Sequence, residues 1–368
     1  FLGQYSGYKN LYLLAKLRNK IGKMKIVQIG AAGHYAYALP TAKKYGLAFE
    51  GLCAADPEDD LDRAQRELSA YGFAPRIYRD WREILLATAP DIAVVNTVMA
   101  RNSEIAAFAL AHGISVFCEK PVATDMAALV KLEDAYRNSV LHYKNKKNIC
   151  FCGMFGIDYL PHFETAYRFV KSGALGDIRL ANAQKSYKMG RREQFYSDRE
   201  KYGGTIPWVA IHAIEWIQRI GGLSPTAVTA YGSTACNAGN GTMEASTLCL
   251  FDCEGGRMAS VSADVMRPSS APTHDDDRLR LVGSEGILEV RGGHVYVIDG
   301  KGERELSPVH TEKELFEEFM LEILGDGKCR VSAEDAFSAT RTALAARESQ
   351  DTGKTVRIGE VGQRSQDE

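Results

Sequence analysis

From Met24 to Pro121 the chain alternates short apolar runs with segments of helical character. The apolar runs are MKIVQIG, FEGLCAAD, RIY, DIAVVNT and ISVFCEKP, and a helical segment follows each of them. Strands that alternate with helices build βαβ units, in which a parallel sheet is covered on both faces. The alternation therefore predicts a doubly wound α/β domain over residues 24–145.

Beyond residue 145 the pattern changes to a succession of strand-like runs with few helices between them. These runs include IRLANAQKSY, TAVTAYGST, STLCLFDC and RLRLVGS. We expect hairpins and turns to join them into a large, mostly antiparallel sheet within an α+β domain over residues 146–368. Among the helices of this part, Thr311 and Glu314 have the spacing of a capping box, and a last helix is expected between Ser332 and Gly353.

The charge balance excludes several classes of partner. Lys and Arg number 45 against 47 Asp and Glu, a formal net charge of −2. Such a chain has no broad basic field for nucleic acid or an anionic membrane surface. No apolar run approaches the roughly 18 residues that span a bilayer. We therefore expect a soluble protein that binds neither nucleic acid nor membrane.

The cysteines and the first residues bear on where the protein works. The eight cysteines are scattered without the spacing or histidine partners of a zinc site, so we expect free thiols in a reducing cytoplasm and no metal. Residues 1–23 hold five Lys or Arg and no acid. We interpret them as an added leader or an over-extended start ahead of Met24, with an amphipathic basic helix as the alternative.

A glycine turn follows the first predicted strand, at Gly30-Ala31-Ala32-Gly33-His34. A strand, a glycine turn and a helix together form the setting in which a helix N-terminus receives a pyrophosphate. Only the first glycine fits G-x-G-x-x-G, but Asp56 ends the second strand 26 residues later, near the offset of about 20 at which a carboxylate binds the ribose hydroxyls. A carboxylate there favours NAD over NADP. The alternative is a tight turn and a helix-capping Asp in a sheet that binds no nucleotide.

Glu119-Lys120-Pro121 follows a buried strand at the carboxyl edge of the sheet, where open α/β sheets bind their ligands. A lysine in that position can hydrogen-bond a substrate hydroxyl or exchange a proton with it. The alternative is a solvated lysine at the end of a strand, followed by a turn proline.

The sequence from Lys25 to Lys120 resembles the Gfo/Idh/MocA family of NAD(P)-dependent oxidoreductases, which includes glucose–fructose oxidoreductase and inositol dehydrogenase. The resemblance rests on GAAGH, on AAD ending at Asp56, on DIAVVNT with NSEIAAFAL, and on ALAHGISVFCEKP, with Asn102 where many relatives have His. It continues in VKSGALGDI, RLRLVGSEGILEV and SAEDAFSATRTALAARESQDTGKTV. It implies a Rossmann domain, followed by a substrate-binding and oligomerisation domain. The cofactor residues that it implies are Gly30, Ala31, Ala32, Gly33, His34, Asp56, Asn96, Thr97, Glu119 and Lys120.

A helical segment after Gly203-Gly204 places Trp208, His212 and Glu215 on one face, at spacings of four and three residues. In the family an Asp and this His act with the Glu-Lys-Pro lysine in proton transfer. Here Trp208 stands at the Asp position, and an indole only donates a hydrogen bond. The resemblance implies that His212 is the general acid/base, while Trp208 offers a platform for a sugar ring or the nicotinamide. The alternative is a packed face without catalysis.

A charged stretch before the two glycines supplies weaker candidates for substrate contacts, namely Tyr187 and Arg191 with its neighbour Arg192. A solvated loop is the alternative. The acids of residues 275–277 follow His274 and could suggest a metal site, but we interpret them as an exposed turn and assign no metal.

Together these features predict a cytoplasmic NAD-dependent dehydrogenase that moves a hydride between nicotinamide and a carbinol carbon of a sugar, cyclitol or related polyol. Lys120 would hydrogen-bond the reacting oxygen and His212 would carry its proton. We expect a homodimer or homotetramer. The alternatives are a non-catalytic sensor or scaffold that binds dinucleotide and sugar, and an NADP-dependent enzyme of the same class.

Overall fold

The computed structural model describes residues 20–359, which form two compact units that alternate along the chain. Unit 1 takes in the chain up to Glu119, then Leu132–Met154 and Lys313–Ser332, and the rest belongs to unit 2. A single boundary near residue 145 is predicted from the sequence. The chain instead returns to unit 1 late, because Phe316 packs on Phe117 there, with ring centroids 5.0 Å apart.

The predicted leader lies mostly outside the described residues, since residues 1–19 are not among them. Within residues 20–23, Ile21 is fully buried and Lys20 pairs with Asp326 of the same unit at 2.9 Å. Among residues 20–359, no helix combines the length and the apolar character needed to cross a membrane.

Unit 1 contains a six-stranded sheet in which every neighbouring pair is parallel, in the order β3-β2-β1-β4-β5-β6. This confirms the doubly wound prediction. The strands β4 and β5 are buried at every position, as their continuous apolar runs predict. The strands are β1 (Lys25–Ile29), β2 (Ala48–Cys53), β3 (Arg76–Tyr78), β4 (Ile92–Val95), β5 (Ser115–Cys118) and β6 (Phe151–Gly153).

The order of the strands reverses between β1 and β4, and ligands of such sheets bind at the carboxyl ends of the strands beside that point. The glycine turn and Asn96 follow directly after these two strands. The helices of this part are η1 (Tyr35–Ala38), α2 (Leu39–Tyr45), α3 (Leu61–Ala70), α4 (Trp81–Thr88), α5 (Met99–Ala111), α6 (Met126–Tyr143), whose residues to Lys131 group with unit 2, and α10 (Leu315–Ile323).

The predicted capping box of Thr311 with Glu314 is wrong. Helix α10 begins at Leu315, and the Glu314 side chain caps nothing. Its carboxylate instead accepts a hydrogen bond of 2.7 Å from the Thr41 hydroxyl, within unit 1. A long-range partner therefore replaces the local one.

Unit 2 is built on a nine-stranded sheet in the order β14-β13-β12-β11-β7-β10-β9-β8-β15. Only β7 and β10 pair in parallel, which confirms a mostly antiparallel sheet. The strands are β7 (Ile178–Tyr187), β8 (Pro225–Ser233), β9 (Ser246–Cys253), β10 (Arg257–Asp264), β11 (Asp275–Gly283), β12 (Gly286–Arg291), β13 (His294–Asp299), β14 (Gly302–Glu305) and β15 (Val356–Arg357).

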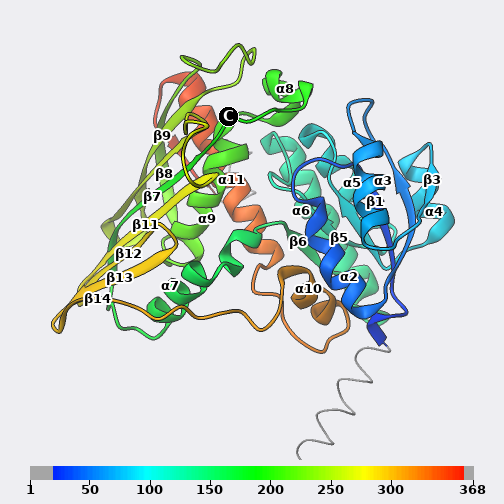
Figure 1. The fold of residues 1–368 in the computed structure, drawn as a ribbon, viewed down its shortest axis with the longest axis horizontal. Coiled ribbons are helices and arrows are strands. Elements are labelled where there is room, and N and C mark those ends of the chain that lie inside the picture. Colours follow the sequence, from blue (N-terminus) through cyan, green and yellow to red (C-terminus); the bar gives the residue numbers. More distant parts are fainter. Residues whose placement is uncertain (1–19, 360–368) are drawn as a thin grey trace, which may run out of the picture. The chain divides into compact units, whose positions relative to one another are not determined.

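Helices α7, α9 and α11 run beside the strands and cover one face of this sheet (Figure 1). The face opposite these helices is called its outer face. The last of them, α11, ends at Thr352 and Gly353 follows with a φ of 65°, so its predicted limits are confirmed. The helices of unit 2 are η2 (Gly156–Tyr159), α7 (Pro161–Lys171), η3 (Gln194–Ser197), α8 (Arg199–Tyr202), a π-helical turn η4 (Ile206–Ala210), α9 (Ile211–Arg219), η5 (Glu254–Gly256) and α11 (Ala333–Thr352).

Candidate functional site

The glycine turn of unit 1 is too tight for side chains at its two glycines. Gly30 has a φ of +77°, and a Cβ there would lie 2.2 Å from the carbonyl oxygen of Asn96. Gly33 has a φ of +60°, and its Cβ would lie 2.5 Å from the carboxyl carbon of Glu119. The positive φ values and the close backbone approach explain why glycine stands at both positions.

Glu119 holds this turn from the end of β5. Its carboxylate is fully buried and accepts hydrogen bonds from the backbone N–H of His34 at 2.7 Å and from His34 Nδ1 at 2.9 Å. Because a carboxylate only accepts, His34 carries its proton on Nδ1. The Asn96 side-chain amide donates to the same carboxylate at 3.2 Å. The structure thus brings together three predicted cofactor residues that lie far apart in sequence.

A loop rich in acids follows β2 and contains Asp56. The Asp56 carboxylate is half-buried and accepts from the backbone N–H of Glu58 at 3.0 Å. Asp59 was not predicted, yet its Oδ2 accepts from the backbone N–H of Ala55 at 2.8 Å and from the Thr97 hydroxyl at 2.8 Å. The acidic run DPEDD was the available signal, but it does not show which carboxylate turns inward.

Asp59 also leaves a buried acceptor available. Its Oδ1 is buried and has no hydrogen-bond partner within residues 20–359, and burial raises the pKa of this carboxyl. Nearby, the Asn102 side chain connects the residues that follow strands β4 and β5. Its Oδ1 accepts from the backbone N–H of Thr97 and its Nδ2 donates to the carbonyl oxygen of Glu119, each at 3.3 Å. A tight glycine turn and two loop carboxylates, one of which has a buried oxygen without a partner in residues 20–359, fit a dinucleotide.

Lys120 directly follows Glu119 but belongs to unit 2, and its side chain is 3% exposed. Its Nζ donates a hydrogen bond of 2.6 Å to the backbone carbonyl oxygen of Trp208, in the same unit. The peptide bond between Lys120 and Pro121 is cis. Lys120 is therefore a buried ammonium with a defined partner, which excludes the alternative of a solvated lysine at a strand end.

Trp208 lies on the π-helical turn η4 and is buried in an aromatic cluster. Its ring packs on Tyr196 at 4.5 Å and edge-on against Tyr202 and Tyr187 at 5.6 and 5.7 Å. The Arg192 guanidinium lies 5.1 Å from the Trp208 ring. Two of the residues predicted to contact the substrate, Tyr187 and Trp208, are thus neighbours. Arg191 is exposed, and the cation of this cluster is Arg192.

His212 begins the next helical turn, on α9, and is 3% exposed. Its ring stands edge-on to Phe155, with ring centroids 6.0 Å apart. Trp208, whose carbonyl oxygen binds Lys120, precedes His212 by four residues, about one helical turn. Lys120 is therefore fixed to the turn that leads into His212.

Glu215, the third member of the predicted face, is part of a buried charge cluster. Arg219 donates from Nε to Glu215 at 2.8 Å and to Asp158 at 2.6 Å. Burial, together with the charge of Asp158, raises the pKa of Glu215 well above its usual range. Glu215 thus belongs to a buried ion cluster with Arg219 and Asp158.

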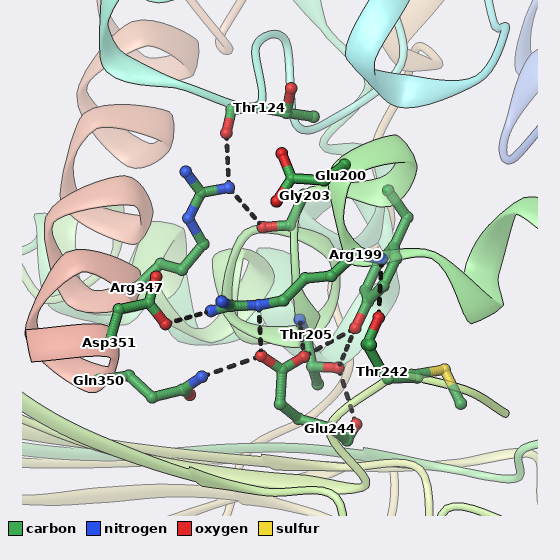
Figure 2. A network of polar contacts seen from close by, with 12 residues as sticks. Thr124, Arg199, Glu200, Gly203, Thr205, Thr242, Glu244, Arg347, Gln350 and Asp351 are labelled. Atoms are coloured by element: carbon green, nitrogen blue, oxygen red, sulfur yellow. Dashed lines mark hydrogen bonds and ion pairs between the residues drawn. The ribbon is translucent and has the colours of Figure 1, made fainter. Parts of the chain in front are cut away.

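A polar network holds the Gly203-Gly204 turn beside the segment that follows Lys120, and Figure 2 shows its members. Arg347 of α11 donates from Nη1 to the carbonyl oxygens of Thr124 at 2.6 Å and Gly203 at 2.9 Å. A Cβ at Gly203, whose φ is +89°, would lie 2.9 Å from the Thr124 methyl group. This close approach is the reason for glycine in the motif.

The same network continues through Glu244 (Figure 2). Arg199 contacts Glu244 and Asp351, each at 2.7 Å, and the Tyr202 hydroxyl donates to Glu244 at 2.7 Å. Burial would raise the pKa of Glu244, but the bond from Tyr202 and the Arg199 charge outweigh it, so the pKa lies below its ordinary value. Sequence reasoning missed this network because its members are spread from Thr124 to Asp351. Within residues 20–359, no group of three His, Cys, Asp or Glu side chains is placed to hold a metal ion.

Two segments of the chain match families of known proteins. Residues 24–143 match the description "Oxidoreductase family, NAD-binding Rossmann fold", and residues 163–289 match the "GFO/IDH/MocA C-terminal domain". A solved structure from Thermotoga maritima, provisionally assigned as an oxidoreductase, is 44% identical, covers 91% of this chain and 100% of that chain, and has a TM-score of 0.86.

More distant relatives carry named activities. Trans-1,2-dihydrobenzene-1,2-diol dehydrogenase of Xenopus tropicalis is 24% identical over 69% of this chain and 72% of its own length. Inositol 2-dehydrogenase of Burkholderia cenocepacia is 25% identical over 45% of this chain, which spans only 48% of that protein. Levoglucosan dehydrogenase, solved with NADH and levoglucosan, shares the fold at 18% identity and a TM-score of 0.74, over 92% of this chain and 100% of that one. The chain belongs to the Gfo/Idh/MocA family of oxidoreductases, and residues 24–143 carry its NAD-binding Rossmann fold.

Proposed function

We propose that this oxidoreductase is an NAD-dependent dehydrogenase that transfers a hydride between nicotinamide and a carbinol carbon of a sugar, cyclitol or related polyol. The observation that carries the proposal is the burial of Lys120. This lysine directly follows Glu119, whose carboxylate accepts a hydrogen bond from the glycine turn. A buried ammonium at this point of the fold has a role in chemistry that a surface lysine lacks.

The residues of unit 1 fit NAD. The N–H groups of Gly30, Ala32 and His34 already bond to protein acceptors, so those of Ala31 and Gly33 are the ones expected to meet the pyrophosphate. Asp56 is proposed to accept hydrogen bonds from the adenosine ribose hydroxyls, with the unpaired Oδ1 of Asp59 as a second acceptor in the same loop. Two carboxylates there would repel a 2′-phosphate, which favours NAD over NADP.

Lys120 and His212 are the proposed catalytic residues. NAD supplies the hydride acceptor or donor. Lys120 would donate a hydrogen bond to the reacting oxygen. His212 would accept the hydroxyl proton during oxidation and return it during reduction. The Trp208 carbonyl would orient the ammonium.

The named relatives support a polar, hydroxylated substrate, since their names specify a diol, inositol and levoglucosan. The second candidate is a sensor or scaffold that binds dinucleotide without turnover, and Trp208 at the family's Asp position is the observation that favours it. A panel of sugars, cyclitols and polyols, incubated with NAD and followed by the absorbance of the reduced cofactor, separates the two. Turnover of any member supports the enzyme. Tight NAD binding without turnover of any member supports the sensor.

A homo-oligomer formed through the outer face of the nine-stranded sheet is also proposed. Tyr231, Leu250 and Met258 lie on the neighbouring strands β8, β9 and β10, and they are 64, 53 and 56% exposed. Together with Leu248 they form an apolar surface of a kind that monomers rarely expose. Light scattering at micromolar concentration should give a multiple of 40.5 kDa, and a monomer mass would contradict the proposal.

The absence of disulfides among the eight cysteines is consistent with the cytoplasm proposed for this enzyme.

A further inference from the structure

The loop after β7 carries three cations close together that lack acidic partners. Among residues 20–359, no carboxylate forms an ion pair with Lys188, Arg191 or Arg192. Lys188 donates from Nζ only to carbonyl oxygens, those of Ser269 at 2.9 Å and Ala271 at 2.6 Å. Within the described part of the chain, no ion pair therefore neutralises these three charges.

Two other cations of the same unit, Lys185 and Arg278, do form ion pairs with carboxylates. Lys185, on β7 itself, is buried between Asp275 at 3.0 Å and Asp277 at 2.9 Å. Arg278 pairs with Asp276 at 2.8 Å. Strand β11, which pairs with β7, thus supplies a carboxylate to each of these two cations. It supplies none to Arg192.

Arg192 is nevertheless held in a fixed position. Its guanidinium lies over the rings of Tyr187 and Trp208, 5.1 Å from each centroid, and 5.9 Å from that of Tyr196. One Nη group donates to the carbonyl oxygen of Lys188 at 3.3 Å, while Nε is buried and has no acceptor within the described part of the chain. A guanidinium is a planar fork that matches the oxygens of a carboxylate or a phosphate.

Trp208 joins this arginine to the proposed catalytic lysine. Its ring lies under Arg192, and its backbone carbonyl oxygen accepts from Lys120. All of these residues belong to unit 2, so the connection lies within one compact body. The Arg192 guanidinium and Lys120 thus both contact Trp208, the first at its ring and the second at its backbone carbonyl oxygen.

We propose that the substrate is an anionic polyol, a sugar acid or sugar phosphate, whose carboxylate or phosphate binds Arg192 while its reacting hydroxyl binds Lys120. The proposal rests on the function proposed above for the same site. In the oxidation the carbinol C–H passes to NAD⁺ as a hydride, the O–H proton passes to His212, and a C=O bond forms. The anionic group is unchanged. The diol, inositol and levoglucosan in the names of the relatives carry no such group, so the proposal sets this chain apart from them.

The test compares a neutral sugar with its uronic or aldonic acid and with its phosphate ester, in the presence of NAD. For the wild type, kcat/KM for one of the anionic forms should exceed that for the neutral form by at least about tenfold, since hydrogen bonds to charged groups are the strong ones. The acid and the phosphate are separate arms, and whichever is preferred identifies the group. A preference for the neutral sugar would overturn the proposal.

Arg192→Met should abolish this preference, lowering kcat/KM for the anionic form at least about tenfold more than kcat/KM for the neutral form. Arg192→Lys should restore part of it, because the charge remains and the fork is lost. Arg291→Met is the matched control, since Arg291 also stacks on a tyrosine, 4.5 Å from the Tyr296 ring, but on β12. Equal losses for anionic and neutral substrates in Arg192→Met would show a structural role and contradict the proposal.

If no sugar is turned over, the function proposed above fails, and binding still decides the present inference. The same three compounds are then titrated into the protein with NADH, and heat of binding or tryptophan fluorescence is followed. Binding of an anionic form that is lost in Arg192→Met and kept in Arg291→Met supports the anion site. Failure of both anionic forms to bind the wild type overturns it.

Discussion

The ammonium of Lys120 donates to the backbone carbonyl oxygen of Trp208, 2.6 Å away, and the Trp208 indole packs among three tyrosines. Position 208, where the family resemblance implies an Asp, thus contacts the lysine through its main chain. Every residue type retains this carbonyl, so the contact does not depend on the side chain. The indole contributes packing.

Trp208→Asp should therefore destabilise the protein without improving catalysis. The change removes a buried ring and introduces a charge beside Tyr196, and losses of about 3–5 kcal/mol accompany the truncation of a buried Trp. Trp208→Phe should cost less, because it keeps an aromatic ring. Urea unfolding and the turnover assay measure both effects. An equally stable and faster Trp208→Asp variant would show that a carboxylate relay is what this site lacks.

Substitution of Asp56 and Asp59, the two acids of the loop after β2, should have different effects on NAD binding and on stability. Asp56→Ala should weaken NAD binding and narrow the preference over NADP, because the proposed ribose acceptor is lost. Asp59→Ala should also lower stability, by about 1–3 kcal/mol, since Ala55 N–H and the Thr97 hydroxyl lose a buried acceptor. Titration of both cofactors and thermal unfolding distinguish the variants. Unchanged NAD affinity in Asp56→Ala would remove Asp56 from the site.

Arg347→Met should lower kcat while leaving NAD affinity unchanged. Its Nη1 fixes the carbonyl oxygens of Thr124 and Gly203, which flank the segments that carry Lys120 and Trp208. A small displacement of reacting groups costs up to about 100-fold in rate, so a fall of roughly 10–100-fold is expected. Arg347→Lys should recover part of the rate. A wild-type kcat in Arg347→Met would show that the network serves stability alone.

The stability of the protein should fall as pH rises from 4 to 6 through the titration of Asp277. Burial raises the pKa of Asp277 from 3.8 to about 6, although the Lys185 ammonium opposes the shift. In this window the folded protein binds a proton that the unfolded chain has released, so stability present at low pH is lost as pH rises, by at most about 3 kcal/mol. Asp277→Asn should lack this component. Urea unfolding of both proteins at pH 4 and pH 6.5 measures the difference, and parallel pH profiles would refute it.

The sequence predicts the fold well because the period of its apolar residues reports directly on the faces that are buried. The continuous runs IAVV and SVFC become strands β4 and β5, buried at every position. The alternation in STLCLFDC becomes β9, with alternate side chains exposed. Such patterns are local, and the elements that they specify are correct.

Contacts between residues far apart in sequence cannot be predicted from such local patterns. Phe316 returns a late helix to unit 1 by packing on Phe117, and Thr41 takes the Glu314 carboxylate that was expected to form a capping box. Neither partner is near in sequence. The choice of Arg192 over Arg191 in the aromatic cluster likewise depends on which side of the loop packs inward. Consecutive residues of the same type give no sequence signal for this.

Lys120→Met tests the proposed chemistry most directly. The substitution removes the ammonium and keeps much of the apolar stem, so NAD binding should stay largely intact. On a substrate found with the polyol panel, kcat should fall at least about 100-fold, the lower end of what a positioned acid–base group contributes. Lys171→Met, at the exposed end of α7, is the control and should retain wild-type kcat. A Lys120→Met enzyme with wild-type kcat would contradict the role assigned to Lys120.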